Sequence, residues 1–204
     1  MEVDLGLEQP PGLTFEAGQW VSVPFGPKTV RAYSIASTPR SSRRLTLCAD
    51  VAPGGIGSGW FRGLAVGQAV EFKAPFGGFV FRRDDPRRPL FVAEEIGIVP
   101  IRSMLADLDE RGVELRATLV YWGRDRSWLP YDAELVALAR RQPGFAYHPV
   151  VGPETLATSV AALAWDARDL VAYVSGGGAM IDAVRGVLMA RGLDRRSVRW
   201  EKFW

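Results

Sequence analysis

A short run near the N-terminus carries side chains that could hold a ligand. The sequence from Arg31 to Ser37 reads RAYSIAS, so a cation, an aromatic hydroxyl and two small hydroxyls lie close together. In an extended segment alternate side chains share a face, which places Arg31, Tyr33 and Ser37 together with Ser34 beside them. Arginine offers a forked donor to an anion, and tyrosine combines a flat apolar ring with a polar tip. The pattern suits a planar, polar-edged, anionic ligand, and it also fits an ordinary exposed edge strand.

A second run, GGIGS, is rich in glycine. Gly54, Gly55 and Gly57 let the backbone approach a ligand closely, because they carry no side chain. Ser58 then opens a short amphipathic stretch, GWFRGL at residues 59–64, whose free amides can bind an anion. The run therefore predicts a cradle for phosphate groups, although two glycines before a helix are also common in a simple turn.

The order of these two runs resembles the ferredoxin–NADP reductase family, in which an Arg-x-Tyr-Ser strand and a Gly-Gly-x-x-Ser turn bind the flavin. The resemblance extends through nearly the whole chain. Further segments resemble family motifs in the same order: APFG at 74–77, VAEEIGIVP at 92–100, YWGR at 121–124, YVSGGGAM at 173–180 and EKF at 201–203.

The resemblance implies roles for the N-terminal residues. Arg31 would pair with the flavin phosphates, Tyr33 would lie along the isoalloxazine ring or the ribityl chain, and the Ser34 hydroxyl would act at the reactive flavin nitrogen. The glycine run would bind the pyrophosphate, so FAD is expected rather than FMN. The flavin site would be completed by Ser37, Cys48 and Ala49, and the Cys48 thiol is expected to be a packing group rather than a reactant.

The resemblance also implies an NAD(P)H site in the C-terminal part. Gly97 and Pro100 would keep a helix start beside the dinucleotide, and Gly176 and Gly177 would form a second close-approach loop. Arg124 would contact a nucleotide phosphate or ribose. The remaining expected contacts are Gly123, Ser175, Met180, Phe203 and Trp204. Of these, Ser175 and Phe203 are expected at the reacting groups, and a terminal aromatic covers the flavin or fills a core.

The sequence departs from the family pattern at Glu94, Glu95 and Ile96, where the family has Gly, Gly and Thr. Two carboxylates add bulk and negative charge where a backbone should approach an anionic pyrophosphate. Ile96 lacks the hydroxyl that the family places close to the nicotinamide.

Three functions stay open. The first is an FAD-dependent reductase that passes electrons from NAD(P)H to a separate ferredoxin, flavodoxin or oxygenase component. The second is an electron-transfer or regulatory flavoprotein with a degenerate nicotinamide site, fed by a partner protein. The third is a flavin-free interaction domain. The sequence does not choose between NADH and NADPH.

The composition of the chain excludes several other classes of protein and kinds of site. A chain of 204 residues with 48% hydrophobic residues can form one or two packed domains, and a formal charge of +2 does not indicate nucleic acid binding. Cys48 is the only cysteine, which excludes an intrachain disulfide, a Cys-ligated iron–sulfur cluster and a structural zinc site. No metal site is expected. No run is apolar enough to span a bilayer and no secretory leader is evident, so a cytoplasmic protein is expected.

The elements around the motifs change character along the chain. Short β-rich runs separated by glycine and proline predict an antiparallel barrel, with strands at 19–24, 30–34, 44–51 and 69–73. In the family that the chain resembles, a further strand precedes the segment matched by residues 18–20, and here only residues 1–9 are available, enough for about one strand rather than two. The barrel could thus lack its first strand: either the start of the chain is misassigned, or the gap leaves a sheet edge for a partner.

A polar, proline-bearing stretch at 84–89 marks the predicted boundary between a flavin-binding domain, residues 1–85, and a nucleotide-binding domain, residues 89–204. Beyond it, apolar strands alternate with helical patterns, which predicts a parallel sheet covered by helices with ligands at the carboxyl ends of its strands. Strands are expected at 90–93, 115–121, 145–151, 169–174 and 198–203, and helices at 100–111, 131–140 and 179–191.

Overall fold

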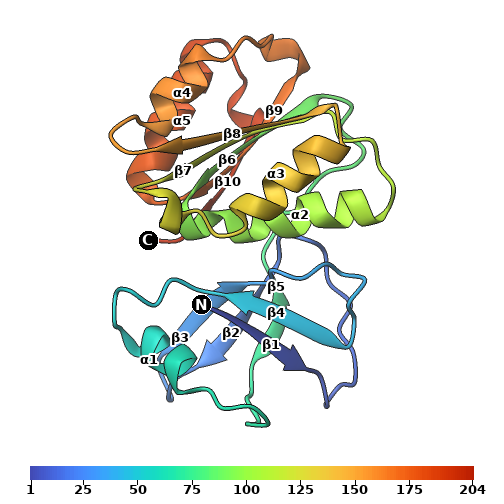
Figure 1. The fold of residues 1–204 in the computed structure, drawn as a ribbon, viewed down its shortest axis with the longest axis vertical. Helices are drawn as coiled ribbons and strands as arrows, with labels where there is room; N and C mark the ends of the chain where they lie inside the picture. Colours follow the sequence, from blue (N-terminus) through green and yellow to red (C-terminus); the bar gives the residue numbers. More distant parts are fainter. The chain divides into compact units, whose positions relative to one another are not determined.

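The computed structural model describes all 204 residues, which divide into two compact units, Met1–Phe81 and Arg82–Trp204 (Figure 1). The sequence places the boundary a few residues later, between residues 85 and 89. The residues just before the predicted boundary are bonded to the second unit: the Arg82 amide donates a hydrogen bond to the Tyr173 hydroxyl over 3.0 Å.

The first unit is built of antiparallel strands, as predicted. Its elements are β1 (Glu2–Gly6), β2 (Trp20–Pro24), β3 (Val30–Ser34), β4 (Arg44–Cys48), helix α1 (Ile56–Gly63) and β5 (Lys73–Phe76). β1 pairs with β4, and β2 lies between β3 and β5. An isolated antiparallel bridge between Ile35 and Leu47 connects the two sheets. Their inward side chains form one core with Phe61 of α1.

Two strands of this unit can be compared with the prediction in detail. The strand expected at 69–73 is wrong, because β5 begins only at Lys73, where its pairing with β2 starts opposite Ser22. The single N-terminal strand expected from residues 1–9 is present as β1, and its partner is β4 alone.

The second unit is a five-stranded parallel sheet with helices on both faces. Its strands are β6 (Arg88–Glu94), β7 (Ala117–Gly123), β8 (Phe145–Val151), β9 (Leu170–Gly176) and β10 (Val198–Lys202), in the order β10-β9-β6-β7-β8. The helices α2 (Ile98–Glu110) and α3 (Asp132–Arg141) cover one face, and α4 (Leu156–Ala162) and α5 (Gly178–Ala190) cover the other (Figure 1). Short 3₁₀ turns are η1 (Glu95–Gly97), η2 (Arg126–Trp128), η3 (Ala167–Asp169) and η4 (Arg195–Ser197).

Alternate side chains of the central strands enter the two layers of helices. Leu90 and Val92 of β6 pack with Val184 and Leu188 of α5, and all four are at most 1% exposed. Because both faces of such a sheet are buried, its strands read as continuous apolar runs. This explains why every strand and helix predicted for this unit is confirmed to within two residues.

The strand order creates a topological switch beside β6. The chain runs from β6 outward through β7 and β8, then returns to the other side of β6 to form β9 and β10. The loops that follow β6 and β9 therefore leave the sheet in opposite directions, and such a switch point is where open parallel sheets bind ligands. We call the region between these two loops the switch-point crevice; it is bounded by Glu94–Gly97 and Ser175–Gly178.

Helix α4 has no counterpart in the prediction. Its cap is clear, since the Thr155 side chain accepts a hydrogen bond from the Thr158 amide, but the helix has only seven residues. None of the helices is long and apolar enough to cross a membrane.

Candidate functional site

The loop before α1 leads into a helix start that can bind an anion. Gly54 has a left-handed backbone (φ +69°), and Gly55 is the residue before the helix, which begins at Ile56, two residues earlier than expected. The first turn contains no acidic residue, and the first amides of a helix have no partner within it. Arg62 fixes the loop by donating to the Val51 carbonyl over 2.8 Å. Ser58 lies in this first turn and is buried.

Tyr33 lies over α1 in an aromatic cluster. Its ring stacks with Trp60 at 5.9 Å between centroids and meets the edge of Phe61 at 5.0 Å. Its hydroxyl lies against Gly57, where a Cβ atom would collide with it, so a larger residue at position 57 would displace the Tyr33 side chain. Burial raises the pKa of Tyr33, and the positive charge of Arg31 acts in the opposite direction. The hydroxyl is thus a neutral hydrogen-bond donor at neutral pH.

Arg31 lies on the same face of β3 as Tyr33, opposite Val23 of β2. Its side chain donates to the Val30 carbonyl over 2.9 Å, is exposed, and forms no ion pair with an acidic residue of the chain. A guanidinium group in this state can bind an incoming phosphate without first breaking a salt bridge.

Ser34 lies on the opposite face of the sheet. In the register of the three strands, Trp20 is directly opposite both Ser34 and Phe76, so these side chains form a row across β3, β2 and β5. Trp20 and Phe76 stack at 5.0 Å, and Gly77 allows the indole of Trp20 to approach the backbone. The structure therefore places Ser34 beside an aromatic pair rather than beside Tyr33.

The other residues expected to bind the flavin take part in strand pairing. The Ser37 hydroxyl accepts a hydrogen bond from the Thr46 amide over 3.1 Å. Ala49 pairs with Met1, and Cys48 is opposite Glu2 in the β1–β4 ladder. The Cys48 thiol is buried, and its expected role as a packing group stays a prediction.

In the switch-point crevice the two chain segments approach each other closely at glycines. A Cβ atom at Gly97 would collide with the Ser175 carbonyl, so glycine is required there. The helices α2 and α5 both begin beside these loops, with Gly97 and Gly177 as the residues before their first turns. Pro100 is buried in the first turn of α2, where proline is tolerated.

One buried polar group in the crevice has no partner. Ser175 is fully buried at the end of β9, and its hydroxyl makes no hydrogen bond. A buried hydroxyl without a partner carries a desolvation cost of about 1–3 kcal/mol. Such a group calls for a partner, which a bound ligand, an ion or an ordered water can supply.

The Glu94 carboxylate enters the same crevice. Its Oε2 atom accepts a hydrogen bond from the Gly177 amide over 2.8 Å, at the start of α5. Burial raises the pKa of Glu94, the Gly177 hydrogen bond lowers it, and the neighbouring Glu95 raises it.

Glu95 has a different environment. It is 7% exposed, has a left-handed backbone (φ +46°), and binds Arg124 through two hydrogen bonds of 2.8 and 3.0 Å. Arg124 also stacks on Trp128 at 3.7 Å, and the Tyr121 hydroxyl donates to the Glu95 carbonyl over 3.0 Å. The positive charge expected to contact a nucleotide is therefore balanced by a carboxylate. Gly123 lets η2 pack closely on the end of β7, because a Cβ there would meet the Trp128 carbonyl at 2.9 Å.

The segment after β10 lies along the β9 loop. Phe203 donates its amide to the Gly176 carbonyl over 3.0 Å, and the Trp204 carbonyl accepts from the Gly178 amide over 3.1 Å. The Trp204 indole lies against Gly177, and the Met180 methyl group lies against Gly176. The structure thus brings Ser175, Gly176, Gly177, Met180, Phe203 and Trp204 together with Gly97.

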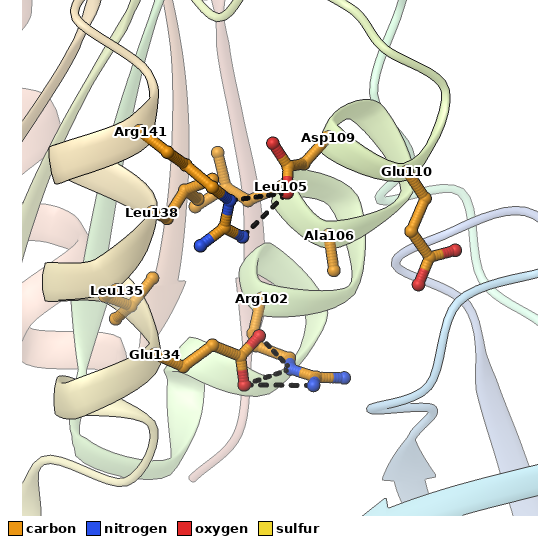
Figure 2. Close-up of a pocket in the computed structure, with 9 residues that line it drawn as sticks. All are labelled: Arg102, Leu105, Ala106, Asp109, Glu110, Glu134, Leu135, Leu138 and Arg141. Atoms are coloured by element: carbon orange, nitrogen blue, oxygen red, sulfur yellow. Dashed lines mark hydrogen bonds and ion pairs between the residues drawn. The ribbon is translucent and has the colours of Figure 1, made fainter.

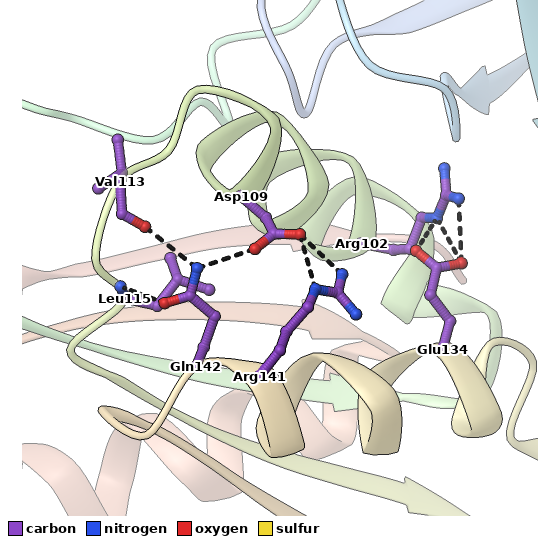
Figure 3. A network of polar contacts seen from close by, with 7 residues as sticks. All are labelled: Arg102, Asp109, Val113, Leu115, Glu134, Arg141 and Gln142. Atoms are coloured by element: carbon purple, nitrogen blue, oxygen red, sulfur yellow. Dashed lines mark hydrogen bonds and ion pairs between the residues drawn. The ribbon is translucent and has the colours of Figure 1, made fainter.

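A separate cleft lies between α2 and α3. It has a volume of about 160 Å³ and is lined by side chains of both helices (Figure 2). Arg102 pairs with Glu134 over 3.0 Å and Asp109 with Arg141 over 2.7 Å. Gln142 also donates to Asp109, which completes a network that fixes α3 on α2 (Figure 3). Because these charges pair with one another, the cleft is a helix-packing contact and not part of the candidate site.

Comparison with known proteins decides the family. Residues 2–81 match the family model described as the oxidoreductase FAD-binding domain. The chain is 33% identical over 213 residues to the reductase component DmpP of phenol 2-monooxygenase from Pseudomonas sp. (strain CF600), covering 97% of this chain and 60% of that protein. It is 35% identical over 149 residues to ferredoxin–NADP reductase B of Sorangium cellulosum (strain So ce56), covering 71% of this chain and 61% of that protein.

The chain belongs to the ferredoxin–NADP reductase-like family of flavoprotein oxidoreductases. Its fold is similar to that of the cytochrome P450 reductase GcoB of Amycolatopsis, with a TM-score of 0.86 and 27% identity over 99% of this chain and 64% of that one. The chain thus spans less than two thirds of the length of these relatives. The family and the two-part fold predicted from the motifs are both confirmed.

Three side chains near the site of this ferredoxin–NADP reductase-like protein were not predicted. Trp20 and Phe76 flank Ser34 only through the register of three strands, which their positions in the sequence do not reveal. Trp128 lies under Arg124 because η2 turns back after β7, and no sequence pattern marks that turn as a stacking platform.

Proposed function

We propose that the chain is the FAD- and NAD(P)H-binding part of a reductase that delivers electrons to a separate redox protein. Residues of the first unit bind FAD, and residues of the second unit bind the nicotinamide nucleotide. When bound, the nucleotide supplies a hydride and the flavin releases the two electrons one at a time. The single observation that supports this function best is the switch-point crevice, where the unpaired Ser175 hydroxyl lies near two helix starts.

The first unit fits FAD. The α1 helix start and Arg31 supply donors to the pyrophosphate, and the positions of Gly54 and Gly55 have no side chain of this protein within 4 Å. Tyr33 binds through its ring and its neutral hydroxyl. Ser34 supplies a hydroxyl on the other face of β3. Ser37, Cys48 and Ala49 support these strands rather than contact the cofactor.

The second unit fits a dinucleotide once the hydrogen bond between Glu94 and the Gly177 amide is exchanged. Ser175 would offer a hydroxyl to the nucleotide, and Met180 with the Phe203–Trp204 segment would line the same loop beside it. Gly97 and Pro100 hold the start of α2 close to the ligand. The Gly177 amide is already bound by Glu94, however, so this donor is exchanged when the nucleotide binds.

The acceptor is a separate ferredoxin, flavodoxin or oxygenase component. The relatives support this, since several are reductase or electron transfer components of oxygenase systems. The chain has only one cysteine and cannot itself hold a Cys-ligated cluster. The expected cytoplasmic location stays a prediction that fractionation of producing cells tests.

A second candidate function follows from the Glu94 contact. If the carboxylate never leaves Gly177, the chain is a flavoprotein that receives electrons from a partner. Equilibrium titrations of the purified chain distinguish the two. We expect FAD to bind with a structured visible spectrum and in preference to FMN, and NAD⁺ or NADP⁺ to bind the FAD-loaded chain. Binding of FAD with no binding of either nucleotide would contradict the proposed function and leave the second candidate.

A further inference from the structure

We propose that Glu94 is an internal competitor of the nucleotide, and that its carboxylate must leave the Gly177 amide before the nucleotide can bind there. This inference rests on the proposed nucleotide site in the second unit. It assigns a gating role to one of the two carboxylates at the end of β6 and a structural role to the other.

The position of Glu94 is one that an acceptor oxygen of a ligand would take. Its Oε2 atom lies 2.8 Å from the Gly177 nitrogen, at the residue before the first turn of α5. The same oxygen lies 3.0 Å from the Cβ position of both Gly176 and Gly177, so the two glycines are what allow the carboxylate to enter. A dinucleotide phosphate would use the same donor and the same partial positive charge of the helix start.

The contacts of Glu94 are weak enough to be exchanged. The carboxylate is half-buried, has one hydrogen bond from a neutral amide, and forms no ion pair. Glu95, by contrast, has two charge-assisted hydrogen bonds to Arg124 and is almost fully buried. The Glu95 carboxylate is thus held by two hydrogen bonds within an ion pair, whereas the Glu94 carboxylate is held by one hydrogen bond from an uncharged donor, so Glu95 stays in place while Glu94 can move.

The charged groups around Glu94 determine whether its carboxylate takes up or releases a proton when the nucleotide binds. The neighbouring Glu95 carboxylate, on η1, carries the same charge as Glu94. Arg124, which follows β7, forms its ion pair with Glu95. On β10, Lys202 lies near Gly178, with its Nζ atom 3.3 Å from that Cβ position, and Glu201 is opposite Ser175. The first turn of α5 has no acidic residue.

Nucleotide binding should therefore take up protons. In the free protein burial already places the pKa of Glu94 above its ordinary value. A carboxylate displaced beside a phosphate loses its amide donor and gains a negative neighbour, which raises its pKa further in the complex. Affinity is then greatest at low pH and falls as the pH rises through these two values.

The test uses the FAD-loaded full chain, with NAD⁺ and NADP⁺ as probes because they do not reduce the flavin. Calorimetric titrations in buffers of different ionisation enthalpy measure the protons taken up per nucleotide bound. The wild-type chain should take up a fraction of a proton and bind more weakly at about pH 8 than at about pH 5.5. The variant Glu94→Gln should bind about tenfold more tightly at the higher pH and lose the proton uptake.

The variant Glu114→Gln is the matched control. Glu114 is an exposed residue paired with Arg116 and has no place in the crevice, so its replacement should leave affinity and proton uptake unchanged. Thermal unfolding and FAD content of each variant establish that it is folded.

The possible outcomes separate the two proposals. Nucleotide binding that involves no proton uptake in the wild-type chain, or equal uptake in Glu94→Gln, would overturn the gating role and leave the proposed function intact. If neither the wild-type chain nor the folded variant binds either nucleotide, both proposals fail.

Discussion

The close approach of the two crevice loops can be tested with a single methyl group. In Gly97→Ala, the new Cβ atom would collide with the Ser175 carbonyl oxygen and would lie 2.7 Å from its carbon and 3.0 Å from the Gly176 Cα atom. All three are backbone atoms at the end of strand β9, so the contact cannot be relieved by rotating a side chain. The backbone of Gly97 is itself right-handed helical (φ −60°), so alanine meets no conformational barrier there.

The expected change in the free energy of unfolding has two contributions, one from the steric contact and one from the flexibility of the unfolded chain. Overpacking of a closely packed region costs about 1–3 kcal/mol. The reduced flexibility of the unfolded chain on replacing glycine by alanine contributes about 0.4–1 kcal/mol in favour of the variant. The free energy of unfolding of the second unit should therefore fall by about 1–2 kcal/mol, and its melting temperature by about 3–8 °C.

The assay is urea and thermal unfolding followed by circular dichroism, with nucleotide titration of the folded variant. Gly186→Ala is the control, because Gly186 lies within α5 and its Cβ position has no neighbour within 4 Å. That change should stabilise the helix by up to about 1 kcal/mol. A Gly97→Ala variant as stable as wild type, with unchanged nucleotide affinity, would refute the reasoning.

Three further predictions concern single side chains. Arg31→Ala should weaken FAD binding by about 1.5–3 kcal/mol in a fluorescence titration, whereas the exposed Arg43→Ala should not, and equal losses would contradict the assigned phosphate contact. Ser175→Ala should raise the free energy of unfolding by about 1 kcal/mol, because it removes a buried hydroxyl without a partner, yet slow flavin reduction by the nucleotide in stopped-flow measurements. The Arg87 hydrogen bond holds the pKa of Asp85 below its ordinary value, so the stability that Asp85 contributes is present above about pH 3.9 and is lost as the pH falls through the folded-state pKa. In Asp85→Asn, the free energy of unfolding should therefore fall less steeply as the pH is lowered into the acid range. An unchanged dependence on pH would exclude the stabilising role of Asp85.

The sequence predicts the fold of the second unit well because its signals are local. Continuous apolar runs and helix ends mark the strands and helices that a doubly covered sheet requires. Helix α4 escapes the prediction because seven residues are too few for a clear period. The position of strand β5 is predicted wrongly because it depends on pairing with Trp20 and Ser22. These residues are distant in the sequence, so the local pattern at residues 69–73 does not reveal the pairing.

Some residues of the candidate site can be predicted from the sequence and others cannot. The glycines and Arg31 can be predicted, because a motif fixes both the residue type and its place. The fates of Glu94 and Glu95 cannot, since the sequence presents them as equivalent. They separate in the structure because the left-handed backbone at Glu95 directs that residue toward Arg124, while Glu94 reaches Gly177 across the sheet.

The most direct test of the proposed function is anaerobic titration of the FAD-reconstituted chain with NADH and with NADPH, following the oxidised flavin band. The account predicts bleaching by at least one nucleotide at stoichiometric amounts. A flavin that is bound and reducible by dithionite, but stays oxidised with either nucleotide, would contradict it.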